Sequence, residues 1–385
     1  MIWAGLILAA TMFVAYANGA NDNFKGVATL FGAGAASYRL ALWWASITTL
    51  AGSICAFFLA RGLIETFSGK GLLPQSYLGD PAFLAAVIMG AGVTVLIAAR
   101  LGLPISTTHA LTGALVGAGL IAVGNELGFA TLGTGFVMPL LVSPVLALVL
   151  TLVLYPTIRW ARTRLGIRRE TCLCIGPPLS RGSLLHRGDT PLGDVSSAAV
   201  LTAALPAIDA VISDSADCER RDRTIYAGRL VGIEAQKVRD GLHFLSAGAV
   251  SFARGLNDTP KIVALAAAFG GLALDRLILA VALVMAVGGL VSARRVAETM
   301  SRRITRLNHG QGLTANFVTA FLVIFASHLG VPVSTTHVSC GALFGIGAAN
   351  GRARWTTVGG IASAWIMTLP IAAAAAALGF WALRS

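Results

Sequence analysis

Two short polar motifs, whose side chains could bind an ion or a substrate, occur twice in this 385-residue sequence, at corresponding places in its two halves. Residues 103–117, LPISTTHALTGALVG, match residues 331–345, VPVSTTHVSCGALFG, with nine identities in fifteen positions. Residues 17–28, ANGANDNFKGVA, match residues 253–264, ARGLNDTPKIVA, in their Ala, Gly, Asn-Asp, Lys and Val-Ala positions. This pairing indicates that the chain holds two copies of one unit.

Each Pro-x-Ser-Thr-Thr-His segment has the chemistry of an anion site. The proline interrupts a helix, and the serine two residues later is a natural N-cap of the next one. N–H groups in the first turn of a helix lack partners within it, and the positive end of the helix dipole favours an anion. Hydroxyl groups that bond back to helical carbonyl groups are the alternative, but they explain poorly why three hydroxyl residues follow a proline twice. The predicted shell for a tetrahedral oxyanion is Ser106, Thr107, Thr108, Ser334, Thr335 and Thr336.

Asp22 and Asp258 occupy the same position in the two copies, and each follows an asparagine, Asn21 or Asn257. A carboxylate at membrane depth is unfavourable and usually faces a bundle interior or a water-filled site. Each aspartate could cap a helix that begins at the next residue, although a neutral serine would be enough for capping. The carboxamide and carboxylate oxygens suit a hard cation or a proton, so these four residues form the predicted coupling site.

Lysines and histidines complete the two motifs. Lys25 and Lys261 follow the aspartates by three residues, which on a helix places each ammonium on the same face as its carboxylate. They would neutralise the carboxylates, attract an anion or do both, and we include them in the predicted substrate site. No Cys or second His is spaced to complete a metal site with His109 or His337, so we expect these histidines to orient the hydroxyl groups or to pack, and we favour both roles over carrying a proton.

The elements that position these motifs are membrane helices. Hydrophobic residues make up 56% of the chain and charged residues 12%, whereas a soluble domain has about 25% charged residues. Of the 46 charged residues, 23 lie in 159–240. The remaining chain has ten longer apolar runs, plus short ones at 26–36 and 262–274 after the Asn-Asp motifs. This composition excludes an ordinary soluble enzyme, a disordered chain and a disulfide scaffold.

The expected fold class is an all-α polytopic membrane protein with two inverted-topology repeats of about five to six helical segments each. Broken or re-entrant helices are expected at its centre. The loop at 61–80 has balanced charges, but its counterpart at 294–306 has five arginines and one glutamate. By the positive-inside rule only the second loop is cytoplasmic, so the copies are inverted, as in many secondary transporters. The expected parts are a first transmembrane repeat at 1–158, a cytoplasmic linker at 159–240 and a second transmembrane repeat at 241–385.

The linker has one apolar stretch, 195–212, which Pro206 and Asp209 interrupt. We predict a helix there that packs on the membrane part without crossing the bilayer. Three cysteines of the linker lack the spacing of a zinc site and are expected to be reduced thiols: Cys172, Cys174 and Cys218.

The paired motifs resemble those of the inorganic phosphate transporter (PiT) family in both halves, at Gly19–Asp22, Pro104–His109, Gly255–Lys261 and Pro332–His337. The resemblance implies inverted repeats of ten to twelve helical segments, phosphate held by the Ser-Thr-Thr segments and cation coupling through the Asn-Asp motifs. Many sodium-coupled members read Gly-x-Asn-Asp-Val-Ala-Asn-Ala, with a second asparagine where this chain has its two lysines. The family also includes sulfate permeases.

The predicted function is secondary active transport: an ion-coupled symporter that imports inorganic phosphate across the plasma or inner membrane, and not an enzyme. A permease for sulfate or another tetrahedral oxyanion is the alternative within the family. An anion channel, from another class, would show uncoupled flux and no role for Asp22. An intramembrane hydrolase is disfavoured by the repetition of the motifs, and no P-loop for ATP is present.

No cofactor is expected beyond a coupling cation, and a proton is favoured over sodium. Lys25 and Lys261 already supply fixed positive charge, and burial favours the protonated form of Asp22 or Asp258 during part of the cycle. The expected partners are phosphate or sulfate and membrane lipid. Nucleic acid is not among them, because the basic residues, which give a net charge of +12, lie mainly at the ends of apolar runs. The oligomeric state is open, with a homodimer as one option.

Overall fold

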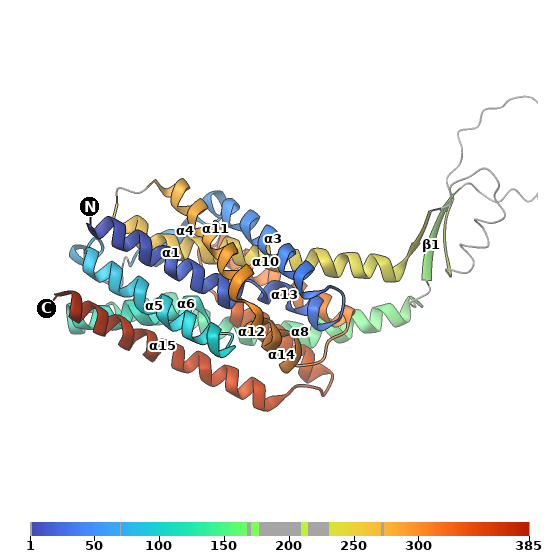
Figure 1. Ribbon diagram of the computed structural model, residues 1–385. Helices are drawn as coiled ribbons and strands as arrows, with labels where there is room; N and C mark the ends of the chain where they lie inside the picture. Colours follow the sequence, from blue (N-terminus) through green and yellow to red (C-terminus); the bar gives the residue numbers. More distant parts are fainter. Residues whose placement is uncertain are drawn as a thin grey trace, which may run out of the picture. The chain divides into compact units, whose positions relative to one another are not determined.

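The computed structural model describes residues 2–69, 71–167, 171–176, 209–214, 231–270 and 273–384. In these residues, each of the ten longer apolar runs forms a long helix or part of one (Figure 1). They are α1 (Ile2–Asp22), α3 (Tyr38–Leu59), α5 (Pro81–Leu101), α6 (Thr107–Val123), α8 (Met138–Arg164), α10 (Ala235–Ala268), α11 (Leu274–Ser292), α13 (His309–His328), α14 (Thr335–Ala349) and α15 (Trp355–Arg384). Short helices α2 (Ala28–Gly32), α4 (Arg61–Phe67), α7 (Phe129–Thr131) and α12 (Arg294–Glu298) connect them.

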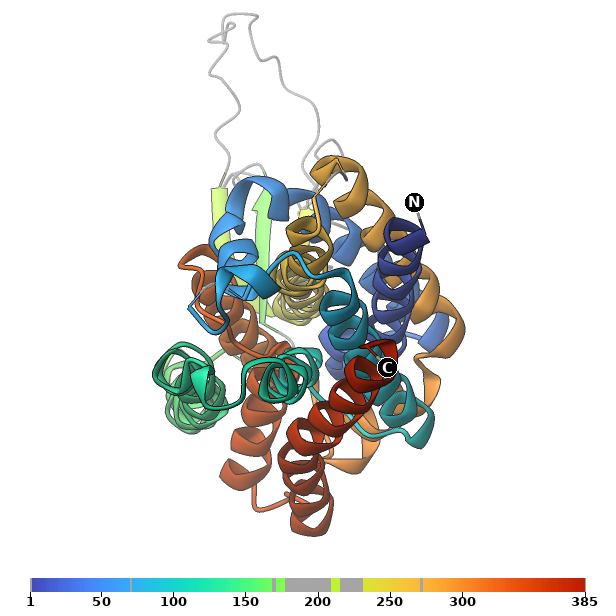
Figure 2. The same ribbon diagram turned by 90° about the vertical axis from the view of Figure 1, so that its left-hand side faces the viewer.

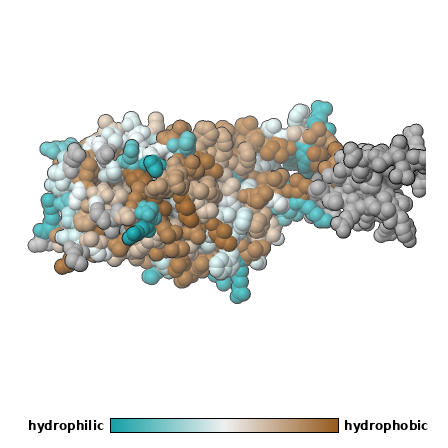
Figure 3. Space-filling model, turned by 90° about the horizontal axis from the view of Figure 1, so that it is seen from above, coloured by the Kyte–Doolittle hydropathy of each residue, from teal (hydrophilic) through white to brown (hydrophobic). Residues whose placement is uncertain are grey.

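The helices make this a multi-pass membrane protein. Among the described residues, eight helical segments are long and apolar enough to cross a bilayer, and brown apolar side chains cover much of the face shown in Figure 3. The prediction of an all-α polytopic membrane fold is therefore confirmed. Helix α14 is not one of the eight, because its 15 residues reach only about 22 Å, less than the hydrocarbon thickness of about 30 Å.

Helix packing in the membrane unit, residues 1–158 and 242–385, brings distant parts of the sequence side by side. Helix α1 packs against α5 and α11, and α15 packs against α5 and α6, as the view nearly along the helix axes shows (Figure 2). Glycines allow the closest approaches. A Cβ atom at Gly117 of α6 would lie 2.0 Å from the carbonyl oxygen of Ala373 in α15, so only glycine fits there.

Helix α10 differs most from the sequence analysis. It runs through Pro260 without a break and continues into the short apolar run after the second Asn-Asp motif. Asp258 therefore lies inside a helix, and Asp22 is the last residue of α1. The alternative in which these aspartates cap following helices is wrong. Proline within a membrane helix is tolerated where neighbouring groups satisfy the backbone group that it frees.

Residues 159–241 form a second compact unit, in which a sheet was not expected. Strand β1 (Thr171–Gly176) pairs antiparallel with β2 (Asp209–Asp214) on one side and β3 (Val231–Glu234) on the other. Leu173 of β1 lies opposite both Ile212 and Ile233. The helix predicted over 195–212 is wrong at its last four residues, which lie in β2, and 195–208 lie outside the described residues. So does Cys218, while Cys172 and Cys174 lie on β1.

Candidate functional site

The starts of α6 and α14 are built alike. The Ser106 hydroxyl accepts a hydrogen bond of 3.1 Å from the backbone N–H of His109, and the Ser334 hydroxyl accepts one of 3.2 Å from that of His337. Both serines are therefore N-caps, as predicted from the prolines before them. All six residues of the predicted anion shell are buried, so both helix starts face the interior of the bundle.

Two lysines bring these helix starts together. The Lys25 ammonium donates to the carbonyl oxygen of Ile105 at 2.7 Å and to the hydroxyl of Thr336 at 2.5 Å. In the other copy, the Lys261 ammonium donates to the carbonyl oxygen of Val333 at 2.6 Å and to the hydroxyl of Thr108 at 3.0 Å. Each lysine thus contacts the helix start of its own copy and that of the other copy. The convergence of the two Ser-Thr-Thr segments follows directly from these contacts.

The two lysines differ in their relation to the aspartates. Lys25 forms an ion pair with Asp22, as its three-residue spacing predicted. The ammonium of Lys261 bonds instead to the neutral oxygens of Thr108 and Val333. Of the two roles considered for the lysines, local pairing with the carboxylate is therefore present in the first copy and not in the second.

One amide links the two carboxylates. The Asn18 Nδ2 donates to Asp22 Oδ2 at 3.1 Å, to Asp258 Oδ2 at 3.2 Å and to the Thr107 hydroxyl at 2.9 Å. Both aspartates and the first hydroxyl residue of α6 therefore meet at a single side chain from α1. The predicted coupling and anion groups lie in one place.

Asn21 and Asn257, which occupy the same position in the two sequence copies, bond to the same elements. Asn21 Nδ2 donates to the carbonyl oxygen of Leu103 at 2.9 Å, and its Oδ1 accepts from Lys25 at 2.7 Å. Asn257 Nδ2 donates to the Thr335 hydroxyl at 3.1 Å, and its Oδ1 accepts from Ser327 at 3.1 Å. Only the first of these carboxamide oxygens therefore faces a cation.

Arg254 is a third buried cation of the site. The sequence motifs did not identify it. Its guanidinium Nε lies 3.7 Å from Asp258 Oδ2, and its Nη1 donates to Asn23 Oδ1 at 2.9 Å. The signal was present, because an arginine stands in an apolar run four residues before Asp258. We call Asp22, Lys25, Arg254, Asp258 and Lys261 the central cluster. None is more than 3% exposed, and three cations against two anions leave one excess positive charge.

The histidines pack beside the central cluster. The rings of His109 and His337 lie 4.2 Å apart between centroids, and the His337 ring lies 3.9 Å from that of Trp365. The Trp365 Nε1–H donates to the carbonyl oxygen of Pro104 at 3.1 Å. This stack holds the two helix starts and α15 together, in agreement with the packing role expected for the histidines.

Comparison with known proteins identifies the family. The model of the phosphate transporter family matches residues 18–376, which include every residue of the central cluster. A relative from Pyrococcus abyssi, provisionally named a phosphate permease, is 28% identical over 98% of this chain and 97% of its own. A relative from Rhizobium meliloti, named a probable low-affinity inorganic phosphate transporter, is 27% identical over 98% and 95%.

A solved structure shares the fold. It is titled the sodium-dependent phosphate transporter and superposes with a TM-score of 0.73 at 22% identity, covering 100% of this chain and 99% of its own. That likeness shows the fold alone. The family of this protein is shown by the family match over nearly the whole chain. The protein belongs to the phosphate transporter family, as its paired motifs indicated, and it is not an enzyme.

Proposed function

We propose that this protein is a secondary transporter that imports inorganic phosphate across the cell membrane, with its anion site at the central cluster. The observation that carries the proposal is the single excess positive charge in a buried site where two helix N-termini converge. Phosphate near neutral pH carries about one to two negative charges. One fixed positive charge therefore balances the phosphate monoanion, and one co-transported cation would complete the balance for the dianion.

The anion shell consists of the hydroxyl residues at the starts of α6 and α14. Thr108 and Thr336 accept hydrogen bonds from the lysines of the opposite copies and donate their own protons to the carbonyl oxygens of Val333 and Ile105. An anion between the helix starts would meet both ammonium groups directly and would replace these carbonyl oxygens as the acceptor of the hydroxyl protons. The serine caps use their oxygens as acceptors, which leaves their hydroxyl protons available to an anion. Donors of this kind at helix starts suit a tetrahedral oxyanion.

The surroundings of Lys25 support a proton as the coupling cation. Its ammonium contacts a carboxamide oxygen of Asn21, a carboxylate oxygen of Asp22, the carbonyl oxygen of Ile105 and the hydroxyl of Thr336. Such an oxygen set is the kind that a hard metal cation takes, and here a fixed ammonium fills it. Asp22 or Asp258 would then bind the coupling proton.

The crossed lysine contacts support an inverted-repeat mechanism. Lys25 contacts Ile105 and Thr336, and Lys261 contacts Val333 and Thr108. Exchanging the two sequence copies converts one set into the other, which is the pattern that a two-fold axis through the site produces. Rocking of one repeat against the other around this site would alternate access, with 159–240 as a cytoplasmic linker between them.

Uptake into vesicles that contain the purified protein tests the substrate. We expect labelled phosphate to accumulate and an excess of unlabelled sulfate to compete weakly. Preferential uptake of sulfate would make the protein a sulfate permease of the same architecture. Flux that never exceeds equilibrium under any ion gradient would indicate an anion channel.

A second experiment tests coupling with imposed gradients. We expect a pH gradient alone to drive phosphate accumulation and a sodium gradient alone not to do so. In the Lys25→Asn variant, which restores a carboxamide at that position, anion binding should weaken or become newly dependent on sodium. Accumulation by the unmodified protein under sodium alone would contradict the proton proposal while leaving phosphate transport intact.

A further inference from the structure

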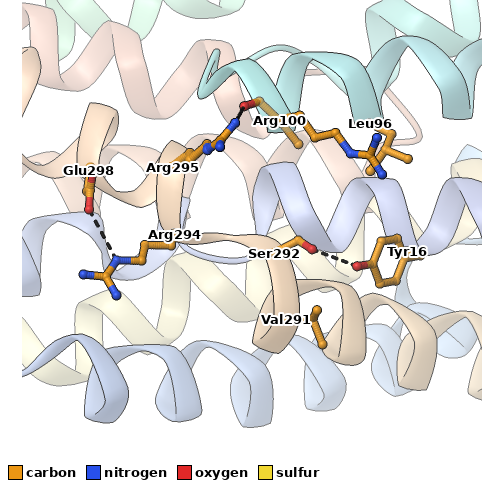
Figure 4. A pocket seen from close by; sticks show the side chains of 9 residues that line it. Tyr16, Leu96, Arg100, Val291, Ser292, Arg294, Arg295 and Glu298 are labelled. Carbon is orange, nitrogen blue, oxygen red and sulfur yellow. Dashed lines mark hydrogen bonds and ion pairs between the residues drawn. The ribbon is translucent and has the colours of Figure 1, made fainter.

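A cavity of about 590 Å³ lies away from the central cluster, where α5 and α11 end and α12 begins. Figure 4 shows its labelled lining residues, which come from α1, α5, α11 and α12. The hydroxyl groups of Tyr16 and Ser292 lie 2.7 Å apart and line one side of the cavity. The contacts of the central cluster do not use any of these residues, so the cavity needs its own explanation.

The cavity is positively charged. Arg100, Arg294 and Arg295 line it together with one acidic residue, Glu298. The Arg294 Nε lies 3.4 Å from Glu298 Oε1, whereas Arg295 donates to a neutral group, the backbone carbonyl oxygen of Arg100. No hydrogen bond or ion pair joins the Arg100 guanidinium to the part of the chain that the structure describes. Two positive charges are therefore left without an acidic partner, and guanidinium groups favour phosphate oxygens.

Exposed apolar side chains form a stripe on each of α5 and α11, and both stripes end beside this cavity. Exposed apolar residues follow each other at four-residue intervals, so they form a stripe along one face of each helix. The stripe on α5 consists of Met89, Val93, Ile97 and Leu101, and the stripe on α11 consists of Leu279, Leu283, Val287 and Val291. Val291 is itself part of the cavity lining and is 70% exposed. The cavity thus joins a charged end to two apolar tracks.

We propose that this cavity binds the headgroup phosphate of an anionic phospholipid, whose acyl chains lie along the stripes of α5 and α11. The guanidinium groups match the headgroup charge, and the Tyr16 and Ser292 hydroxyls match its polar oxygens. Free phosphate shares the headgroup chemistry but has no use for the apolar stripes, which is why the lipid is the better occupant. This site is separate from the proposed transport site and does not depend on it.

Binding of a fluorescent phosphatidylglycerol to the purified protein in zwitterionic detergent tests the proposal. We expect saturable binding that phosphatidylcholine competes for poorly. The Arg100→Gln variant removes a guanidinium that forms no hydrogen bond or ion pair with the described residues, and its lipid affinity should fall about fivefold. Adding Arg295→Gln, which removes the second guanidinium without an acidic partner, should lower it by about the same factor again. Arg276→Gln, a control that removes one arginine near the opposite end of α11, should bind like the unmodified protein.

Competition with inorganic phosphate distinguishes a site for a lipid headgroup from a site for free phosphate. Under the proposal, millimolar phosphate leaves the bound phosphatidylglycerol in place. Displacement of the lipid by phosphate in the unmodified protein, with weaker phosphate binding in Arg100→Gln, would make the cavity a free-phosphate site and overturn the proposal. Equal lipid affinity in Arg100→Gln, in the double variant and in the unmodified protein would also overturn it.

Discussion

Asn18 and Arg254 stand at the same position in the two sequence copies and are hydrogen-bonded to each other, with 2.5 Å between Arg254 Nη2 and Asn18 Oδ1. The two copies therefore meet at a pair of residues that differ in charge. Because the Asn18 amide also donates to Asp22 and Asp258, the arginine is linked to both carboxylates. The excess positive charge of the central cluster depends on this one departure from repeat symmetry.

Replacing Arg254 by Gln should destabilise the protein and abolish transport. The change leaves Asp258 buried without its ion-pair partner, and breaking a buried pair in this way costs about 3–5 kcal/mol. Thermal unfolding in detergent measures the loss of stability. The double variant Arg254→Gln with Asp258→Asn removes both charges and should recover most of that loss. Equal melting temperatures for the single and double variants would mean that the two residues are not coupled.

Lys261 should matter more for anion affinity than the Lys25–Asp22 pair. Lys261→Gln removes a full positive charge, whereas Asp22→Asn combined with Lys25→Gln leaves the net charge of the central cluster unchanged. A hydrogen bond to a charged group contributes about 1.5–3 kcal/mol, so Lys261→Gln should weaken phosphate binding about tenfold to a hundredfold. Equilibrium binding of labelled phosphate compares the variants. A larger loss in the charge-neutral pair variant would contradict the assignment.

The hydroxyl groups of Thr107 and Thr335 should also contribute to anion binding. Valine keeps the shape of threonine and removes the donor, so each Thr→Val change should lower phosphate affinity about tenfold to a hundredfold. Thr319→Val is the matched control, since this buried threonine donates only to the Ala315 carbonyl oxygen of its own helix. Unchanged affinity in both Thr107→Val and Thr335→Val would remove these hydroxyl groups from the site.

Glycine at position 117 should be required for the packing of α6 on α15. An alanine Cβ there would lie 2.0 Å from a backbone oxygen of Ala373, and overpacking of this kind costs about 1–3 kcal/mol. Gly5→Ala in α1 is the control, because a Cβ atom at Gly5 meets nothing within 4 Å. The melting temperature in detergent should fall for Gly117→Ala and stay level or rise for Gly5→Ala. A lower melting temperature for Gly5→Ala than for Gly117→Ala would show that the close approach at Gly117 does not determine stability.

Local chemistry could be predicted from the sequence. A proline followed two residues later by serine predicts a capped helix start, and both starts form as expected at Ser106 and Ser334. The Lys25–Asp22 pair depends only on a three-residue spacing and also forms. Such features arise from neighbours along the chain, whatever the rest of the fold does.

Features that depend on distant partners could not be predicted. Lys261 has the same spacing to its aspartate as Lys25, yet Thr108, which lies 153 residues away, accepts its hydrogen bond instead. Arg254 escaped notice because a comparison of identities passes over the position where the copies differ. The apolar stretch 195–212 is long enough to favour a helix, but its last residues lie in β2 (Asp209–Asp214). The strand forms because it pairs with β1, a distant partner that the local pattern does not reveal.

The crossed lysine contacts have a consequence for the kinetics of the empty carrier. Lys25 bonds to Thr336 and Lys261 bonds to Thr108, so buried hydrogen bonds join the two sequence copies in both directions. Under the proposed mechanism, reorientation without phosphate would have to break both of these buried bonds, whereas a bound phosphate could take over the donors. Counterflow, in which unlabelled phosphate on one side speeds the exit of labelled phosphate from the other, should therefore outpace net efflux.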